Sequence, residues 1–231
     1  MLGQNYLFKN FKFKIDKKKK QKILENFKKL IVSKNQIISS LDKDYKDSYD
    51  KNFVKKFNNI KNFRLIGMGG SILGAKAIYK FLEPSFKKFQ FIENFSNKTN
   101  NKKKVNLIIS KSGNTLETIS NTNVLIKKTE KNIFITENKK SYLQELANKL
   151  KAEIISHNNY IGGRYSVLSE VGMLPAQLMG YKPEKFRRLN HLIKNKRFIN
   201  SLVNNVSNIC NLSKKKTNSI ILNYDYKSTE F

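Results

Sequence analysis

The chain alternates between short apolar runs and longer segments in which apolar residues return every three or four positions. Four apolar runs, at 63–69, 105–110, 132–137 and 153–158, each lead through a polar or glycine-containing loop into a segment with helical spacing. Runs of this length, bounded by turn residues, are typical of strands buried in a parallel sheet. Four strand–loop–helix units in succession predict an α/β fold, with a mostly parallel sheet covered by helices on both faces in three layers.

The segments outside these four units have helical periodicity. Residues 18–33 place apolar side chains at helical spacing and predict an amphipathic helix before the sheet. Further helices are expected from Pro183 to about Lys216, and the apolar run at 218–224 has the pattern of another strand. We therefore expect three parts: an N-terminal helical segment over 1–59, an α/β domain with its following helices over 60–212, and the start of a second α/β domain over 213–231.

Composition narrows the class of protein. A chain of 231 residues with 39% hydrophobic and 11% aromatic residues can bury a core, which argues against wholesale disorder. The single cysteine, Cys210, excludes an internal disulfide framework and favours a reducing cytoplasm. The two histidines, His157 and His191, lie far apart without cysteine neighbours, so no zinc site is expected. No apolar run is long enough to cross a bilayer, and the N-terminus lacks the pattern of a signal peptide.

The net charge of +29 points toward anionic partners such as nucleic acid or an anionic membrane. However, the basic residues are mostly lysine and are scattered among many Asn, Ile and Phe, a mixture that AT-rich codons encode. The lysine clusters at 17–20, 102–104 and 214–216 fall between periodic segments, where solvated loops and helix ends are expected. Because the sequence has no nucleic-acid-binding motif, we expect neither specific nucleic-acid binding nor membrane binding. The charge should still favour anionic small substrates.

Three loops lie where a parallel sheet binds its ligands, after the carboxyl ends of strands and before helices with free amide hydrogens. The first loop, "GMGGSILG" at 67–74, nearly fits two phosphate motifs. The dinucleotide fingerprint would need glycine at Ile72, and the Walker A motif would need lysine at Ala75. What remains is a glycine turn that lets a ligand approach the backbone, with the hydroxyl of Ser71 at the helix start. A tight turn without a ligand explains this loop equally well.

The second loop, "SKSGNT" at 110–115, carries three hydroxyls and one cation. Ser110, Ser112 and Thr115 can turn their hydroxyls toward one anion, and Lys111 adds a positive point charge. This set at a helix N-terminus suits a phosphate monoester.

A capping role explains only part of the same loop. Asn114, with Glu117 three residues later, has the spacing of a cap for the following helix. Capping leaves the three hydroxyls and the lysine unexplained, so we favour phosphate binding here.

The third loop, "IGGRYSVLS", places Arg164 after two glycines and before a helix, in a chain that otherwise prefers lysine. Arg164 is either part of a surface ion pair or a fixed planar cation that stabilises negative charge developing on an oxygen atom.

Taken together, "GMGGSILG", "SKSGNTLET" and "GGRYSVLSEVGMLPA", in this order and spacing, resemble the glucose-6-phosphate isomerase family. That family is built from two sugar-isomerase (SIS) domains, and the resemblance covers the first, roughly residues 60–212. It implies a SIS-type α/β fold and an aldose–ketose isomerase of glycolysis and gluconeogenesis. The reaction would interconvert glucose 6-phosphate and fructose 6-phosphate through a cis-enediolate, without a cofactor or a metal. It also implies a cytoplasmic enzyme that forms a homodimer.

The resemblance also implies a role for each matching residue. Arg164 would stabilise the enediolate. Sugar-phosphate contacts would come from the first two loops, namely from Gly70, Ser71, Ser110, Lys111, Ser112 and Thr115. The form "SKSGNT" departs from the commoner "SKTFTT" at Gly113 and Asn114, which replace bulkier residues and bring the loop closer to those of other SIS isomerases.

One part of the family pattern is absent from the sequence. Proton transfer needs a carboxylate base, which the family supplies from a glutamate in an "ESxGK"-type motif, assisted by a histidine and a lysine further on. None of those motifs is present, and neither Glu170 nor Glu230 matches the base. His157 and His191 do not match the family histidine, and we expect them to be structural or exposed.

We therefore expect an N-terminal portion of an isomerase that binds sugar phosphate weakly and turns over little. Two alternatives remain open: a stand-alone SIS module that binds a sugar phosphate without converting it, and a lysine-rich binder of nucleic acid or membrane surfaces.

Overall fold

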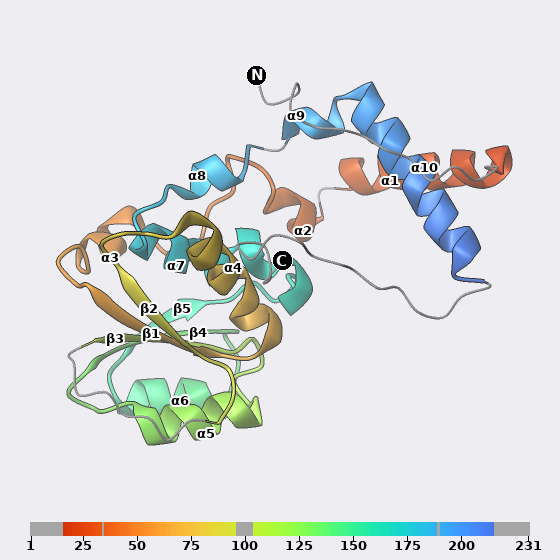
Figure 1. The fold of residues 1–231 in the computed structure, drawn as a ribbon. Coiled ribbons are helices and arrows are strands. Elements are labelled where there is room, and N and C mark those ends of the chain that lie inside the picture. Colours follow the sequence, from red (N-terminus) through yellow and green to blue (C-terminus); the bar gives the residue numbers. More distant parts are fainter. Residues whose placement is uncertain (1–15, 34, 96–103, 189, 215–231) are drawn as a thin grey trace. The chain divides into compact units, whose positions relative to one another are not determined.

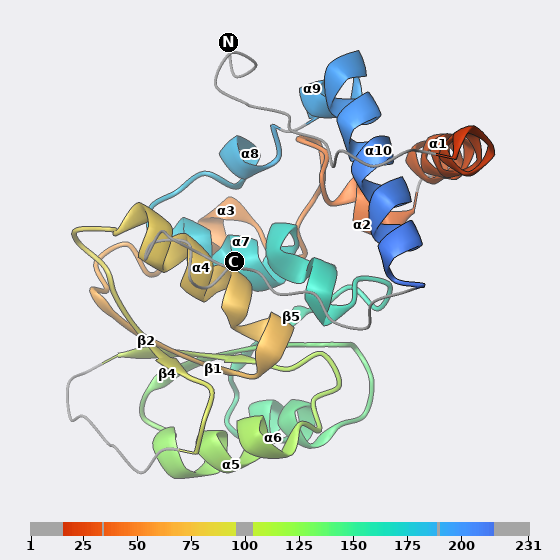
Figure 2. The same cartoon turned by 45° about the vertical axis from the view of Figure 1, so that its right-hand side comes forward.

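The computed structural model describes residues 16–33, 35–95, 104–188 and 190–214 (Figures 1 and 2). The chain divides into two compact units. Within the described residues, one unit combines the chain up to Lys43 with the chain from Arg187 onward, and the other consists of Asp44–Phe186. The strand predicted at 218–224 lies outside the described residues.

The first unit is helical. It contains α1 (Lys17–Val32), α2 (Gln36–Ser39), α9 (Asn190–Ile193) and α10 (Lys196–Leu212), and α1 packs against α10. The carboxylate of Asp16 caps α1 by accepting from the amides of Lys18 and Lys19, and the side chain of Asn195 caps α10 in the same way. The amphipathic helix predicted over 18–33 is confirmed.

The second unit contains a sheet of five parallel strands in the order β2-β1-β3-β4-β5. The strands are β1 (Asn62–Gly67), β2 (Lys88–Ile92), β3 (Val105–Ile109), β4 (Lys131–Thr136) and β5 (Glu153–Ser156). Four of them were predicted from their apolar runs. β2 was missed because its sequence, "KFQFI", begins with Lys88 and has Gln90 between its two phenylalanines, so it contains no continuous apolar run.

Helices cover both faces of this sheet. α5 (Leu116–Leu125) and α6 (Tyr142–Lys149) lie on one face, and α3 (Lys51–Lys55), α4 (Leu73–Leu82) and α7 (Glu170–Leu178) on the other (Figures 1 and 2). Short 3-10 helices, η1 (Gly69–Ser71) and η2 (Gly163–Leu168), precede α4 and α7, and α8 (Pro183–Phe186) follows α7. The predicted three-layer α/β fold, with helices on both faces of a parallel sheet and an N-terminal helix before it, is confirmed.

The central strands are mostly apolar on both sides, because helices cover both faces of the sheet. In β1, Phe63 and Leu65 pack into the core under α3, α4 and α7, while Ile66 packs into the core under α5 and α6. A run of this kind carries no alternation, which is why length and flanking glycines identify it as a strand.

The strand order places a switch point between β1 and β3. β1 pairs with β2 on one side and with β3 on the other. The helix after β1, α4, covers one face of the sheet, and the helix after β3, α5, covers the opposite face (Figure 1). The loops that follow β1 and β3 therefore diverge, and in open α/β sheets ligands bind at this divergence.

None of the described helices is long and apolar enough to cross a membrane.

Candidate functional site

The first two loops begin side by side at the switch point. Gly67 ends β1 and pairs with Ile109, the last residue of β3. A Cβ atom on Gly67 would lie 3.1 Å from the carbonyl oxygen of Ile109, so the two strand ends are in close contact. The loops 67–71 and 110–115 consequently leave the sheet from adjacent positions.

The hydroxyls of the second loop divide into two kinds. Ser110 is buried, its Oγ lies 2.9 Å from Thr115 Oγ1, and it also accepts a hydrogen bond of 3.2 Å from the Gly113 amide. Ser112 is exposed and accepts from the Asn114 amide at 3.2 Å. Ser110 thus fixes the shape of the loop and engages the hydroxyl of the half-buried Thr115, while Ser112 carries the exposed hydroxyl.

The capping prediction for this loop was wrong. Thr115, not Asn114, is the N-cap residue of α5, and no side chain in the described part of the chain caps that helix. The Asn114 Oδ1 atom instead accepts a hydrogen bond of 2.9 Å from the amide of Tyr142, the first residue of α6, and Leu143 donates to the carbonyl of Gly113 at 3.0 Å. The loop therefore caps α6, and the first amides of α5 remain available to an anion.

Gly113 is required at its position. Its φ angle of 67° lies in the left-handed region, and an added Cβ atom would come within 2.1 Å of Ser141 Oγ and 3.0 Å of Thr136 Oγ1. Only glycine accommodates both the backbone angle and the contact with the start of α6. This contact gives a physical reason for the glycine in "SKSGNT".

Lys111 is engaged by its neighbours. Its ammonium group donates to the carbonyl of Asn159 at 2.7 Å and lies 3.5 Å from the carboxylate of Glu137, which also pairs with Lys139. Burial alone would raise the pKa of Glu137, but the ammonium groups of Lys139 and Lys111 hold that pKa below its ordinary value. Lys111 thereby ties the second loop to the segment that leads into the third.

The first and third loops touch through their glycines. A Cβ atom on Gly70 would lie 2.3 Å from the backbone of Gly163, so the two backbones are in direct contact. The hydroxyl of Ser166 lies 3.1 Å from the carbonyl oxygen of Gly70 and 2.8 Å from that of Gly163. Ser166 therefore links the two loops, a role that the sequence did not reveal because its acceptors are backbone carbonyls.

Arg164 follows Gly163 at the start of η2 and is exposed. Its guanidinium forms no hydrogen bond or ion pair with any residue in the described ranges, so the surface ion pair considered from the sequence is not formed there. Ser71, at the end of η1, is half-buried, and its amide donates to the carbonyl of Met68 at 3.1 Å.

His157 and Glu170 form a buried pair, whereas His191 lies at the surface. His157 and Glu170 are buried, with 2.7 Å between His157 Nδ1 and Glu170 Oε1, and the same oxygen accepts from the Asn158 amide at 2.8 Å. His191 is exposed, and its Nδ1 lies 2.8 Å from the carbonyl oxygen of Arg188. Because Glu170 holds two groups beneath the third loop, its role is to anchor that loop, as expected of a residue outside the family's base motif.

The structure thus joins the three predicted loops through two bridges, Lys111 to Asn159 and Ser166 to Gly70. Two cavities of this unit, of about 300 and 540 Å³, lie elsewhere, and none of the three loops lines them. The uncapped α5 N-terminus, the exposed hydroxyl of Ser112 and the exposed Arg164 all favour an anion, so the candidate site lies at the three loops. Within the described residues no cluster of three or more His, Cys, Asp or Glu side chains is placed to hold a metal ion.

The fold and these loops define an α/β protein with a candidate anion site at the switch point of a parallel sheet. Comparison with known families identifies the family of the chain. Residues 18–221 match the family model described as "Phosphoglucose isomerase". The chain belongs to the phosphoglucose isomerase family.

Similar proteins support this assignment. A glucose-6-phosphate isomerase of Methanocaldococcus jannaschii is 33% identical over 211 residues, covering 82% of this chain and 52% of that protein. A glucose-6-phosphate isomerase of Campylobacter jejuni is 37% identical over 149 residues, covering 56% of this chain and 36% of that protein. The chain therefore spans about half the length, or less, of these relatives.

A solved structure shares the fold. A hypothetical protein of Thermus thermophilus superposes with a TM-score of 0.62 at 20% identity, covering 85% of this chain and 53% of that one.

Proposed function

We propose that this chain supplies the sugar-phosphate part of a glucose-6-phosphate isomerase site. The full reaction interconverts glucose 6-phosphate and fructose 6-phosphate through a cis-enediolate, in a cytoplasmic enzyme that needs no cofactor. The observation that carries the proposal is the start of α5. Its first amides have no side-chain cap in the described chain, and the hydroxyls of Ser112 and Thr115 stand beside them.

Each loop takes one part of the substrate. The second loop holds the phosphate through Ser112, Thr115 and the α5 amides, while Ser110 keeps the loop in shape and Lys111 contributes positive charge. Gly70 and Ser71 approach the sugar from the first loop, where glycine allows the ligand to come close to the backbone. Arg164 then lies over the reacting carbons and stabilises the negative oxygen of the enediolate.

The carboxylate base is assigned to no described residue. Glu137 is held by two lysines and Glu170 by His157 and the Asn158 amide, so neither is free to abstract a proton. We propose that the base acts together with these loops in the complete active site. We also retain the proposed division at 1–59, 60–212 and 213–231, and a homodimeric assembly.

A titration with fructose 6-phosphate tests the proposal. Calorimetry on the whole chain should detect binding, and Ser112→Ala with Thr115→Ala should weaken it by at least about 100-fold, since each hydrogen bond to a charged group contributes about 1.5–3 kcal/mol. Ser120→Ala with Thr129→Ala removes the same two hydroxyl types outside the site and serves as the matched control. Equal affinity in the two double variants would remove the phosphate assignment. Binding without isomerisation in the intact protein would instead favour a stand-alone sugar-phosphate-binding module.

A further inference from the structure

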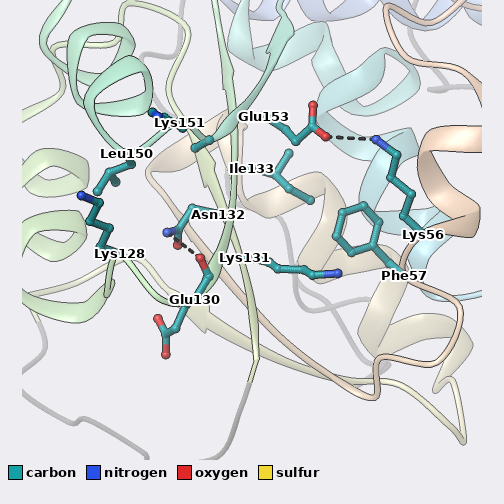
Figure 3. A pocket seen from close by; sticks show the side chains of 11 residues that line it. Lys56, Phe57, Lys128, Glu130, Lys131, Asn132, Ile133, Leu150, Lys151 and Glu153 are labelled. Atoms are coloured by element: carbon teal, nitrogen blue, oxygen red, sulfur yellow. Dashed lines mark hydrogen bonds and ion pairs between the residues drawn. The ribbon is translucent and has the colours of Figure 1, made fainter.

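A cavity of about 300 Å³ opens at the opposite end of the strands from the three loops, where β4 and β5 begin (Figure 3). Its walls come from the turn after α3, the loop before β4, the first residues of β4, and the turn between α6 and β5. The lining residues that carry the argument are Lys128, Glu130, Lys131, Asn132, Lys151 and Glu153. The volume is at the lower end of the range for small-molecule sites.

The charges around this cavity are unbalanced. Four lysines line it against two glutamates, and Lys56 pairs with Glu153 at 3.1 Å (Figure 3). The remaining lysines, at 128, 131 and 151, are exposed, and none forms an ion pair with a carboxylate in the described ranges. Lys131 Nζ instead lies 5.7 Å from the centre of the Phe57 ring.

The remaining carboxylate, Glu130, is already engaged. Its Oε2 atom accepts from Asn106 Nδ2 at 2.8 Å and from the Lys127 amide at 3.2 Å. Asn106 also donates to Asn132 Oδ1 at 2.7 Å, so the cavity wall is the outer end of a buried polar row that crosses β3 and β4.

Two buried cations, Arg64 and Lys104, lie near this polar row. Arg64, 1% exposed, donates to the carbonyl of Leu125 and, at 3.4 Å, to Asn106 Oδ1, while its Nε atom has no partner within the described residues. Lys104, which directly precedes β3, is 6% exposed. Burial lowers the pKa of Arg64 and of Lys104, and the charge of Arg64 lowers the pKa of Lys104 further. The carboxylate of Glu130 acts in the opposite direction on the pKa of each cation. One carboxylate thus serves two buried cations, and the potential at the cavity is positive from its wall as well as from its rim.

The rest of the lining limits the kind of anion. Phe57, Ile133, Leu150 and Ala152 give the cavity an apolar part, and three lysines with compact, mobile ammonium groups suit phosphate oxygens. We propose that this cavity is a second anion site, separate from the three loops at the carboxyl ends of the strands, for a small ligand that carries a phosphate or pyrophosphate group.

Pyrophosphate is the probe for this site. Titrated into the 15N-labelled chain at physiological salt, it should shift the amide signals of residues 128–132 and 150–153. Lys128→Met, Lys131→Met and Lys151→Met together should raise its Kd at least about tenfold. Lys18→Met, Lys22→Met and Lys29→Met, all exposed on α1, remove the same charge from the other unit and should leave the Kd within about twofold.

The possible outcomes distinguish a built site from diffuse charge attraction and from nucleic-acid binding. Equal weakening in both triple variants would overturn the proposal in favour of diffuse charge attraction. Amide shifts confined to residues 110–117 would place pyrophosphate at the second loop and would also overturn the proposal. A single-stranded oligonucleotide that displaces pyrophosphate and shifts lysine-bearing segments throughout the chain would replace the small ligand with nucleic acid. Because Ser112→Ala with Thr115→Ala leaves this cavity intact, failure of the isomerase assignment would not affect the result.

Discussion

Replacing Gly113 with alanine tests how the phosphate loop is built. A residue with a Cβ atom at a φ angle of 67° costs about 1–2 kcal/mol. The added methyl group would also lie 2.1 Å from Ser141 Oγ and 2.6 Å from Ser141 Cβ. Overpacking of this kind costs about 1–3 kcal/mol, partly offset by the lower entropy of the unfolded alanine chain. We therefore expect Gly113→Ala to lower the free energy of unfolding by about 3 kcal/mol.

Two companion variants separate these contributions. Gly113→Ala with Ser141→Gly removes the clash with Ser141 but keeps the unfavourable φ angle and the 3.0 Å contact with Thr136 Oγ1, so it should recover about half of the loss. Gly162→Ala is the matched control, because Gly162 has an ordinary φ angle of −72° and nothing within 4 Å of an added Cβ atom. That variant should be as stable as the parent chain or slightly more stable.

Urea unfolding provides the measurement. The chain has no tryptophan, so far-UV circular dichroism is the appropriate signal. A Gly113→Ala variant within about 0.5 kcal/mol of the parent would show that the loop does not need the left-handed angle or the contact with Ser141. Equal destabilisation by Gly162→Ala would refute the reasoning in another way, because it would mean that any glycine of these loops is equally sensitive.

Two further predictions concern the bridges between the loops. Ser166→Ala removes the hydroxyl that links Gly70 to Gly163. It should lower fructose 6-phosphate affinity about fivefold and the free energy of unfolding by only about 1 kcal/mol. An unchanged affinity by calorimetry would contradict this positioning role. Glu137→Gln should lower stability at pH 7, and the effect should fade as pH falls. The pKa of Glu137 is depressed, so its contribution is complete above the ordinary value of about 4.5 and is lost as pH falls through the folded-state pKa. Urea midpoints across pH check this, and a difference between parent and variant that persists at the lowest pH would exclude the ion pairs with Lys111 and Lys139 as its source.

Much of the fold could be predicted from the sequence because buried strands and amphipathic helices have distinct periods. β2 could not, since its short segment begins with Lys88 and Gln90 separates its phenylalanines, which leaves no continuous apolar run. The order of the strands, which creates the switch point, has no signature in local periodicity.

The candidate site was predictable where its residue types are unusual and not where its geometry depends on long-range contacts. Hydroxyls beside a glycine, and an arginine in a lysine-rich chain, mark the second and third loops in the sequence. The bond from Ser166 to Gly70 joins residues 96 positions apart. Asn114 was assigned to the wrong helix for the same reason, since its true partner, Tyr142, is 28 positions away.

The central claim is that three loops from different strands form one sugar-phosphate site, and amide chemical shifts test it most directly. Fructose 6-phosphate should shift the signals of residues 112–117 together with those of Gly70, Ser71 and Arg164, whereas inorganic phosphate should shift mainly 112–117. Shifts in the second loop alone with both ligands would reduce the site to a simple anion-binding helix start. No shift in any of the three loops at millimolar fructose 6-phosphate would contradict the account.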